Sequence, residues 1–291
     1  MVAEGRFVIS WFEVIEGARQ LILGYNAKGI RPTLRQVHYR LASGQVGGYS
    51  NAKACYKGLS QRLVEARMEG LIPWDALADH VRYRWWNRLS GWRMPDLDEV
   101  LERAVKGLGE DPWERMGKRI VLWLEKDALA ELVWGAVRDL YIPLCVSRGY
   151  SSWTFIHDSL DLLRSDLDVK VFYLGDHDPS GLDIERFTRE AMEYFDVDFE
   201  LKRLALTFEQ VLAYRLLPNP TKRPDPRARE YIAKYGDECW ELDALEPTTL
   251  QAIIRGAIEA EMDKSLWNEV EICNQKIRRR ILEDLRRRLK P

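Results

Sequence analysis

The chain has 291 residues and a mass of 34.0 kDa, which is long enough for two domains with separate hydrophobic cores. Its 46% hydrophobic and 31% charged residues argue against disorder over most of the length. The start, Met1–Arg6, has no signal-peptide character and no apolar run approaches a membrane span, so we expect a cytoplasmic protein with no membrane partner. The four cysteines form no C-x-x-C pair, which argues against a zinc site or a disulfide framework.

The charge is distributed unevenly along the chain. Residues 1–90 carry 13 Lys and Arg against 7 Asp and Glu, and residues 271–291 carry 8 against 3. Since the whole chain has a net charge of −2, the residues between these ends hold −13. Basic ends are suited to a phosphate backbone and an acidic middle to a cation, although ordinary surface charge is the alternative from charge alone.

The N-terminal third is expected to be helical. Apolar spacing predicts a helix at residues 8–27, a second helix after the N-cap Thr33, and a third helix at residues 52–69. A β-prone run follows at residues 81–86. Three helices followed by such a run indicate a winged helix-turn-helix domain over residues 1–92, and a plain three-helix bundle is the competing interpretation.

Basic residues on the third helix are the first candidates for DNA contacts. Lys53, Lys57 and Arg62 lie on the helix that would enter the major groove of a duplex in a winged-helix domain. In a three-helix bundle the same side chains would simply be solvated.

Residues 93–291 are expected to form an α/β domain with a helical C-terminal extension. Strands predicted at residues 119–124, 142–146, 171–175 and 199–206 alternate with helices near residues 126–137, 153–164 and 181–194. This alternation is typical of a Rossmann-like, mainly parallel sheet.

Three acids follow two of these strands. Glu125 comes directly after the first strand, and Asp176 and Asp178 come directly after the third. The carboxyl ends of neighbouring parallel strands meet at one edge, and two like charges 4 Å apart repel by about 4 kcal/mol at an effective dielectric of 20. A divalent cation, Mg²⁺ or alternatively Mn²⁺, is therefore the expected counter-charge. An Asx turn with a helix N-cap is the simpler explanation of the two aspartates alone.

The order of these segments resembles a known family. A strand ending in Glu125, a short strand at 142–146, the glycine-containing loop 147–152 with Arg148, and the run Asp176-His-Asp178-Pro-Ser-Gly are similar to the Toprim domain of topoisomerases and primases. The match is best to the A subunit of topoisomerase VI and its meiotic double-strand-break relatives. The short chain is most similar to the stripped-down A-subunit relatives found on mobile elements.

The stretch Leu34–Arg40 resembles the catalytic motif of the same family. Carried over by position, Arg35 is the motif arginine and Tyr39 the nucleophilic tyrosine, while His38 stands where the family often has another aromatic residue. A tyrosine with a pKa near 10 needs activation, and Arg35 lies one helical turn away on the same face. His38 is a candidate acceptor for the phenolic proton. Without the family resemblance, Tyr39 would be interpreted as a half-buried helix residue.

The resemblance implies a magnesium-dependent transesterase acting on double-stranded DNA at the nucleoid. Tyr39 would become linked to a 5′ phosphate, with Glu125 among the catalytic residues. A double-strand break implies a homodimer, in which each tyrosine acts with the metal site of the other subunit. The family also raises a separate ATPase subunit as a partner, and the sequence does not decide whether one exists.

Two other functions stay open from the sequence. A Toprim-type hydrolytic nuclease of the plasmid-defence kind would use water as nucleophile and Tyr39 only as a structural residue. A DNA-binding protein with an inactive site would bind duplex DNA without cutting it. Arg148 is a further candidate DNA contact. Lys222 and Arg223 in the proline-rich loop 217–226 are candidate DNA contacts or parts of a rigid surface connection. The basic helix predicted at 267–289 would pack a partner, bind DNA or be solvated.

Overall fold

The computed structural model describes residues 9–78, 97–151, 153–163 and 166–289, and every structural statement below concerns these residues. The β-prone run at residues 81–86 and the expected linker between the domains lie outside them. The winged helix and the domain boundary at residue 92 therefore stay predictions.

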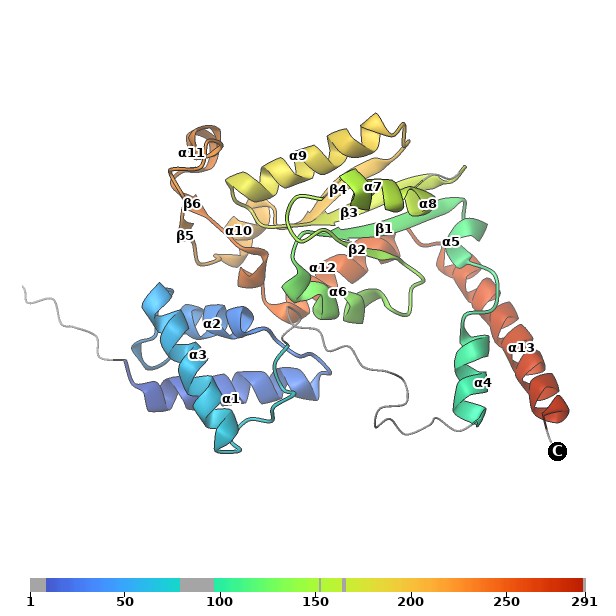
Figure 1. Cartoon of the computed structure of the whole chain (residues 1–291), viewed down its shortest axis with the longest axis horizontal. Helices are drawn as coiled ribbons and strands as arrows, with labels where there is room; N and C mark the ends of the chain where they lie inside the picture. Colours follow the sequence, from blue (N-terminus) through green and yellow to red (C-terminus); the bar gives the residue numbers. More distant parts are fainter. Residues whose placement is uncertain (1–8, 79–96, 152, 164–165, 290–291) are drawn as a thin grey trace, which may run out of the picture.

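The N-terminal helices form a small group with its own core (Figure 1). They are α1 (Trp11–Ala27), α2 (Leu34–Ser43) and α3 (Lys53–Met68), with the 3-10 turn η1 (Val46–Gly48) between the last two. The three predicted helices are confirmed, and so is the N-cap of α2. Thr33 Oγ1 accepts a hydrogen bond from Gln36 N at 3.1 Å, and Gln36 Oε1 accepts one from Thr33 N at 2.9 Å, which satisfies two backbone donors at once.

A four-stranded parallel sheet forms the centre of the rest of the chain. Its strands are β1 (Lys118–Leu124), β2 (Leu144–Val146), β3 (Asp168–Leu174) and β4 (Glu200–Ala205), in the order β2-β1-β3-β4. The predicted α/β class with a parallel sheet is confirmed. Because Leu124 pairs with Leu174, β1 and β3 end side by side, and the acids that follow them start from the same edge.

Helices cover both faces of the sheet because successive strand residues point to opposite sides. On one face Ile120, Leu122 and Leu124 pack against α6 (Ala130–Val137) and α12 (Pro247–Ala260). On the other face Val121 and Trp123 pack against α7 (Trp153–Asp158), α8 (Leu160–Leu163) and α9 (Pro179–Tyr194). Figure 1 shows these two layers on opposite sides of the sheet.

Some boundaries differ from the sequence-based expectation. The single helix expected at residues 153–164 is divided into α7 and α8 around Ser159, whose hydroxyl donates to Phe155 O at 2.8 Å. A serine that bonds the carbonyl four residues back competes with helical geometry. The helix expected from Lys126 begins as the 3-10 turn η2 (Asp127–Leu129).

The remaining elements lie around the sheet. They are α4 (Leu97–Lys106), α5 (Pro112–Arg115), α10 (Phe208–Tyr214), β5 (Asn219–Pro220), α11 (Ala228–Tyr235), β6 (Glu238–Cys239), η3 (Leu242–Ala244) and α13 (Lys264–Arg288). In Figure 1, α4 runs beside α13 away from the sheet. The sequence did not lead us to expect α5, α11, α12 or the β5–β6 pair. None of the described helices has the length and apolar character needed to span a membrane.

The helical group packs on the sheet domain through α1 and α2. Tyr25, Ile30 and Tyr39 belong to the hydrophobic cluster formed by α6, α12 and the sheet rather than to the core of their own helices. Asn51 Nδ2 donates to Pro218 O at 2.8 Å across the same contact. The tyrosine singled out by the sequence thus lies at the junction of the two parts.

Candidate functional site: acids, a buried lysine and Tyr39

The turn between β3 and α9 holds the two aspartates in different roles. Asp178 is the N-cap of α9, and its Oδ1 accepts a hydrogen bond from Gly181 N at 2.6 Å. Asp176 points toward η3, where its Oδ1 accepts one from Leu242 N at 2.8 Å. The helix-cap interpretation of the aspartates therefore holds for Asp178, while the buried Asp176 needs another explanation.

Glu125 lies beside this turn, as the register of β1 and β3 requires. Its Oε2 accepts a hydrogen bond from Asp176 N at 3.2 Å, and the side chain is buried. Burial, followed by the negative charges of Asp176 and Asp178, raises the pKa of Glu125 above its usual value. The structure thus brings the three predicted acids to one edge of the sheet.

Two glycines make room for these carboxylates. A Cβ atom on Gly175 would lie 2.6 Å from Glu125 Oε2, and one on Gly181 would lie 2.3 Å from the carbonyl oxygen of Asp176. Both distances are well inside van der Waals contact. No other residue type fits at either position without moving the acids or the turn.

Lys126 is the positive group at this edge. Its Nζ lies 2.6 Å from Asp243 Oδ2, 2.9 Å from Glu241 Oε2 and 3.1 Å from Asp176 Oδ2. Burial disfavours the ammonium, but the three acids, Asp243 foremost, outweigh it and raise the pKa of Lys126 well above the usual value. Lys126 therefore stays charged and supplies part of the counter-charge that the sequence led us to assign to a cation.

A backbone bridge explains why Glu241 and Asp243 reach this place. His177 N donates to Trp240 O at 2.8 Å, and Trp240 N donates back to His177 O at 2.9 Å. This antiparallel pair lays the segment 240–243 along the Asp176–Asp178 turn. The sequence gave these two acids no role beyond support, and their signal was a cluster of acids around Trp240.

Glu241 connects Lys126 to the helix that carries Tyr39. One carboxylate oxygen accepts from Lys126 Nζ, and the other forms an ion pair with Arg35 Nη1 on α2. Burial raises the pKa of Glu241, but Lys126 and Arg35 reverse this and lower it below the usual value. A continuous line of ion pairs thus runs from Arg35 through Glu241 and Lys126 to Asp176.

The phenol of Tyr39 lies next to this line. Tyr39 is only 2% exposed, and its hydroxyl oxygen accepts a hydrogen bond from Asn219 Nδ2 at 2.7 Å. Burial, and after it the charge of Glu241, raises the pKa of Tyr39 to about 12, although Asn219, Arg35 and Lys126 act in the opposite direction. As it stands, Tyr39 is a weak nucleophile in a strongly charged setting.

A surface pocket of about 380 Å³ opens beside Tyr39. Two of the predicted DNA-binding residues, Lys53 and Lys57, line it together with Arg35 and Tyr56. The Arg35 guanidinium lies 5.3 Å from the centre of the Tyr56 ring. Three cations around one hollow next to a phenol are suited to bind a phosphate group.

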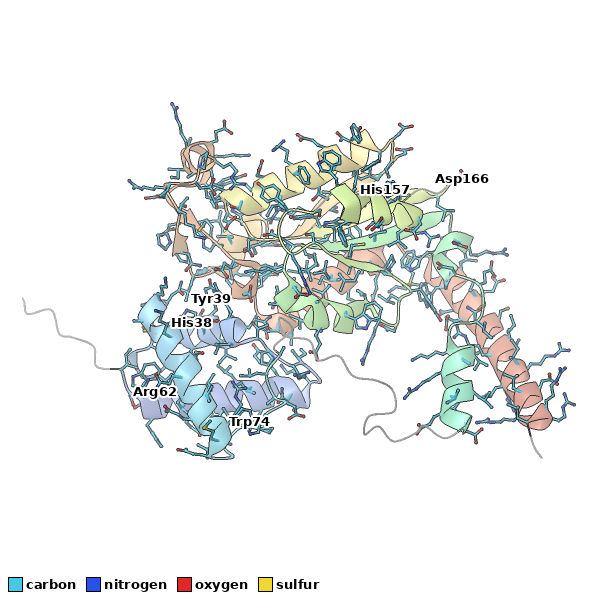
Figure 2. The ribbon with its side chains drawn as sticks, in the orientation of Figure 1. His38, Tyr39, Arg62, Trp74, His157 and Asp166 are labelled. Atoms are coloured by element: carbon cyan, nitrogen blue, oxygen red, sulfur yellow. The ribbon has the colours of Figure 1, made fainter. Side chains whose placement is uncertain are left out.

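The other predicted DNA-binding residues lie elsewhere. Arg62 does not line the pocket, and its guanidinium carbon lies 4.0 Å from the centre of the Trp11 ring. Figure 2 shows Arg62 apart from His38 and Tyr39 on the helical group. Arg148 pairs with Asp127 just beyond β1 at 3.2 Å. Arg223 pairs with Asp237, and Lys222 is exposed in the same loop.

Arg203, which the sequence analysis did not single out, braces the acidic turn from β4. Its guanidinium donates to the carbonyl oxygens of Gly175, Asp176, Gly181 and Leu206 at 3.1–3.2 Å. Its Nε also donates to a carboxylate of α9, Glu185, at 2.6 Å. Nothing in the sequence pattern distinguished this arginine from others on an edge strand.

The donor set is compatible with a divalent cation, although it is not preassembled. Among the described residues, no three His, Cys, Asp or Glu side chains form a group ready to hold an ion. Glu125 nevertheless has no cationic hydrogen-bond partner there, and burial, followed by the charges of Asp176 and Asp178, raises its pKa. Carboxylate oxygens that destabilise one another in this way suit Mg²⁺ or Mn²⁺, and Glu125, Asp176 and Asp178 are the residues that would hold it.

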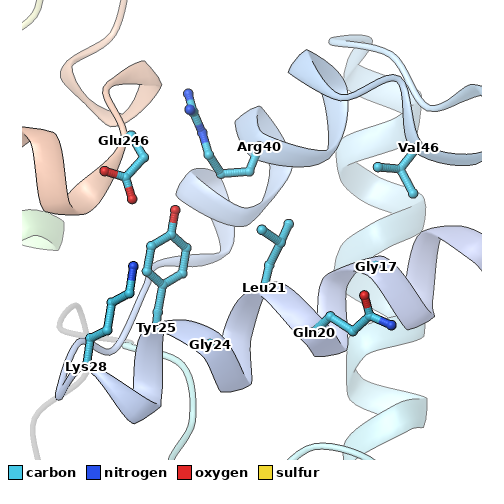
Figure 3. Close-up of a pocket in the computed structure, with 9 residues that line it drawn as sticks. All are labelled: Gly17, Gln20, Leu21, Gly24, Tyr25, Lys28, Arg40, Val46 and Glu246. Atoms are coloured by element: carbon cyan, nitrogen blue, oxygen red, sulfur yellow. The ribbon is translucent and has the colours of Figure 1, made fainter.

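A second pocket contains none of the residues predicted from the sequence. It has a volume of about 470 Å³ and lies between α1, α2 and the start of α12 (Figure 3). Tyr25, Lys28, Arg40 and Glu246 line it. Glu246 is the N-cap of α12 and accepts from Thr249 N at 2.8 Å, so its carboxylate serves the fold.

No protein-family model matches the chain, and no curated protein matches it either. The function is therefore inferred from the site itself.

Proposed function

We propose that this chain cleaves double-stranded DNA by transesterification, with Tyr39 as nucleophile and with Mg²⁺ held by Glu125, Asp176 and Asp178. One observation supports this most: the ion pairs that lead from Arg35, one turn from Tyr39, to Asp176 at the acidic edge. These ion pairs connect the helix that carries Tyr39 to the acids at that edge. The proposal agrees with the resemblance to the topoisomerase VI A subunit and its Toprim domain.

The cations near Tyr39 have separate tasks in this proposal. Lys53 and Lys57 bind the DNA backbone at the pocket, and Arg35 holds the phosphate that Tyr39 attacks. Lys126 keeps its proton, because its pKa is raised, and acts as a fixed positive charge rather than as a general acid. A bound magnesium ion would add positive charge for the phosphate and for the departing oxygen.

The proposed step conserves bonds and protons. The Tyr39 oxygen forms a bond to phosphorus while the bond between phosphorus and the 3′ oxygen breaks. The phenolic proton passes to a base, and the released 3′ oxygen takes up one proton. Because a phosphodiester replaces a phosphodiester, the reverse reaction can reseal the strand without a nucleotide.

One tyrosine cuts one strand, so a double-strand break needs two copies of the chain. We therefore propose a homodimer. The family resemblance implies that each tyrosine acts with the acids of the other subunit, but Arg35 and Lys126 of one chain share Glu241, which favours a site within one chain. A separate ATPase subunit stays a prediction.

A covalent-adduct assay with end-labelled duplex DNA and Mg²⁺ tests the proposal. Wild-type protein is expected to become linked to the 5′ end of the broken strand, and Tyr39→Phe is expected to form no adduct. Tyr25→Phe, a second buried tyrosine of the same helical group that lies outside the site pocket, is the matched control and should retain adduct formation above one tenth of wild type. Wild-type protein that forms no adduct at any cation concentration would refute the assignment of Tyr39.

A hydrolytic nuclease is the second candidate. It is favoured by the burial of Tyr39 and by its pKa of about 12, which leaves very little phenolate at neutral pH. In that case water attacks the phosphate, cleavage needs the same acids, and Tyr39→Phe cuts DNA as fast as the wild type. Salt-dependent DNA binding without cleavage under either cation would point to a DNA-binding protein with an inactive site.

A further inference from the structure

A chain of side-chain hydrogen bonds ends at the Tyr39 hydroxyl, and several of its members line the pocket of about 380 Å³ beside Tyr39. Tyr49 Oη is 2.7 Å from His38 Nδ1, and His38 Nε2 is 2.9 Å from Asn51 Oδ1. Asn51 Nδ2 is 3.3 Å from Asn219 Oδ1, and Asn219 Nδ2 is 2.7 Å from Tyr39 Oη. Four bonds thus join five side chains from α2, from the segment between η1 and α3 and from β5.

The direction of every bond in this chain follows from one contact. Asn51 Nδ2 also lies 2.8 Å from Pro218 O, and a backbone carbonyl can only accept. The nitrogen of the Asn51 amide must therefore face Pro218 and Asn219, so its oxygen faces His38. If the Asn51 amide were flipped, its oxygen would face the oxygens of Pro218 and of the Asn219 side chain.

The same contact decides the state of the histidine. Because Asn51 Oδ1 is an acceptor, His38 Nε2 must carry a hydrogen. Burial lowers the pKa of His38, so the ring is neutral, and Nδ1 accepts the hydrogen bond of the Tyr49 hydroxyl. Neither ring nitrogen contacts Tyr39. The sequence suggested His38 as the acceptor of the phenolic proton, but the histidine ring is not placed for that role.

At the other end, the Asn219 amide is also fixed. Its oxygen accepts from Asn51, so its nitrogen donates to the Tyr39 oxygen. All donors in the chain point toward Tyr39, which receives a hydrogen bond and keeps its own hydrogen for another acceptor. A donor held in this way is arranged for the charged phenolate more than for the neutral phenol.

The antiparallel β5–β6 pair brings the segments of Asn219 and Glu241 together. Asn219 pairs with Cys239, two residues before Glu241, and α11 lies between the two strands along the chain. Burial, and after it the charge of Glu241, raises the pKa of Tyr39, whereas Asn219, Arg35 and Lys126 lower it. Among these groups, Asn219 acts through a direct hydrogen bond to the phenol oxygen.

We propose that Asn219 is a catalytic residue that stabilises the Tyr39 phenolate, and that Asn51 and His38 are positioning residues that fix the direction of its amide. This inference rests on the proposed function for its catalytic meaning. The hydrogen-bond chain itself makes a prediction that needs no DNA. Loss of the donor at position 219 must raise the pKa of the phenol at position 39.

The first experiment measures that pKa directly. 3,5-Difluorotyrosine, whose fluorines bring the phenol into an accessible pH range, replaces Tyr39, and its ¹⁹F shift is followed against pH in magnesium-free full-length protein. Asn219→Leu is expected to raise the pKa by about one to two units, because the charged phenolate loses a hydrogen-bond donor that the neutral phenol needs less. Asn219→Asp, which replaces the donor by a carboxylate, should raise it further. Equal pKa values in wild type and Asn219→Leu would overturn the inference.

Two more variants separate the loss of the Asn219 hydrogen bond from a general destabilisation of the fold. Asn26 also donates two partly buried hydrogen bonds, to Ile30 O and Ala76 O, but its side chain does not contact Tyr39 or Asn219. Asn26→Leu is therefore the matched control and should leave the phenol pKa unchanged. Asn51 does not bond the phenol itself but orients the amide of Asn219, so Asn51→Leu should shift the pKa in the same direction by less. A shift in Asn26→Leu as large as in Asn219→Leu would also overturn the inference.

The second experiment adds DNA. If Tyr39 is the nucleophile, Asn219→Leu should lower adduct formation about 10- to 100-fold at neutral pH and move its pH profile to higher pH. Failure of the wild type to form any adduct would defeat the proposed function while leaving the titration result valid. Normal adduct formation by Asn219→Leu, with an unshifted pH profile, would defeat the catalytic role of Asn219 alone.

Discussion

The protonation of Glu125 makes the free energy of unfolding depend on pH. Its folded-state pKa is raised above the ordinary 4.5 of a glutamic acid, so in magnesium-free protein the folded state binds more protons than the unfolded state above that pH. The free energy of unfolding must then fall as the pH rises from 4.5 through the raised pKa. A bound divalent cation would remove this dependence by favouring the carboxylate.

Glu125→Gln tests this linkage. In EDTA at pH 8–9, the variant should be more stable than the wild type by about 2 kcal/mol, because it no longer ionises a buried group. At pH 4–5 the two proteins should be equally stable. Added Mg²⁺ should raise the melting temperature of the wild type but not that of the variant. Urea unfolding across the pH range checks the first part, and a pH-independent difference between the proteins would contradict it.

Lys57 and Arg62 lie on one helix, yet only Lys57 lines the pocket. We expect Lys57→Gln to reduce the slope of log K against log salt for duplex binding by about 1, since one phosphate contact is lost. Arg62→Gln should leave that slope unchanged and instead lower stability, because the stacking on Trp11 is lost. Fluorescence anisotropy at several salt concentrations measures both. Equal slopes for the two variants would show that the pocket is not a phosphate site.

At the scale of elements, Arg203 ties β4 to the turn between β3 and α9. Arg203→Met removes a buried charge-assisted network and leaves Glu185 without its partner, so it should lower the free energy of unfolding by about 3 kcal/mol. Arg203→Lys keeps the charge but cannot donate to as many carbonyl oxygens, and should lose less. Chemical denaturation gives the values. A loss below about 1 kcal/mol in Arg203→Met would mean that the turn is held by other contacts.

Elements with a local cause were predictable from the sequence. The capping residue Thr33 marks the start of α2, and apolar runs mark β1 and β3. Each of these signals lies within the element itself or next to it, and all three elements are present in the structure. The acids after β1 and β3 followed from the edge rule for parallel strands. Contacts between distant segments were not predictable: Glu241 reaches Lys126 only because of the backbone bridge at His177, which no local pattern announces. The helices α11 and α12 were not predicted, although Pro247 at the first position of α12 is typical of a helix start.

At the scale of the whole molecule, the family resemblance implies that Tyr39 acts with the acids of a partner subunit, whereas the ion pairs of Arg35, one helical turn from Tyr39, lead to acids of the same chain. A mixed dimer decides between these arrangements. Tyr39→Phe and Glu125→Gln chains are co-expressed with different tags and purified through both. If each site is built within one chain, every site in the mixed dimer carries one defect and no adduct forms. If sites are shared between chains, one of the two sites is intact and DNA is nicked on one strand.

The glycines at positions 175 and 181 have a consequence for how such chains are interpreted. A single methyl group there would collide with the Glu125 carboxylate or with the carbonyl oxygen of Asp176, while every acid, lysine and tyrosine stayed in the sequence. A homologue with alanine at either place would look complete in a survey of functional side chains and still lack the space in which they work. Inactive relatives of this protein are therefore recognised by substitution of Gly175 or Gly181 as well as by substitution of the acids.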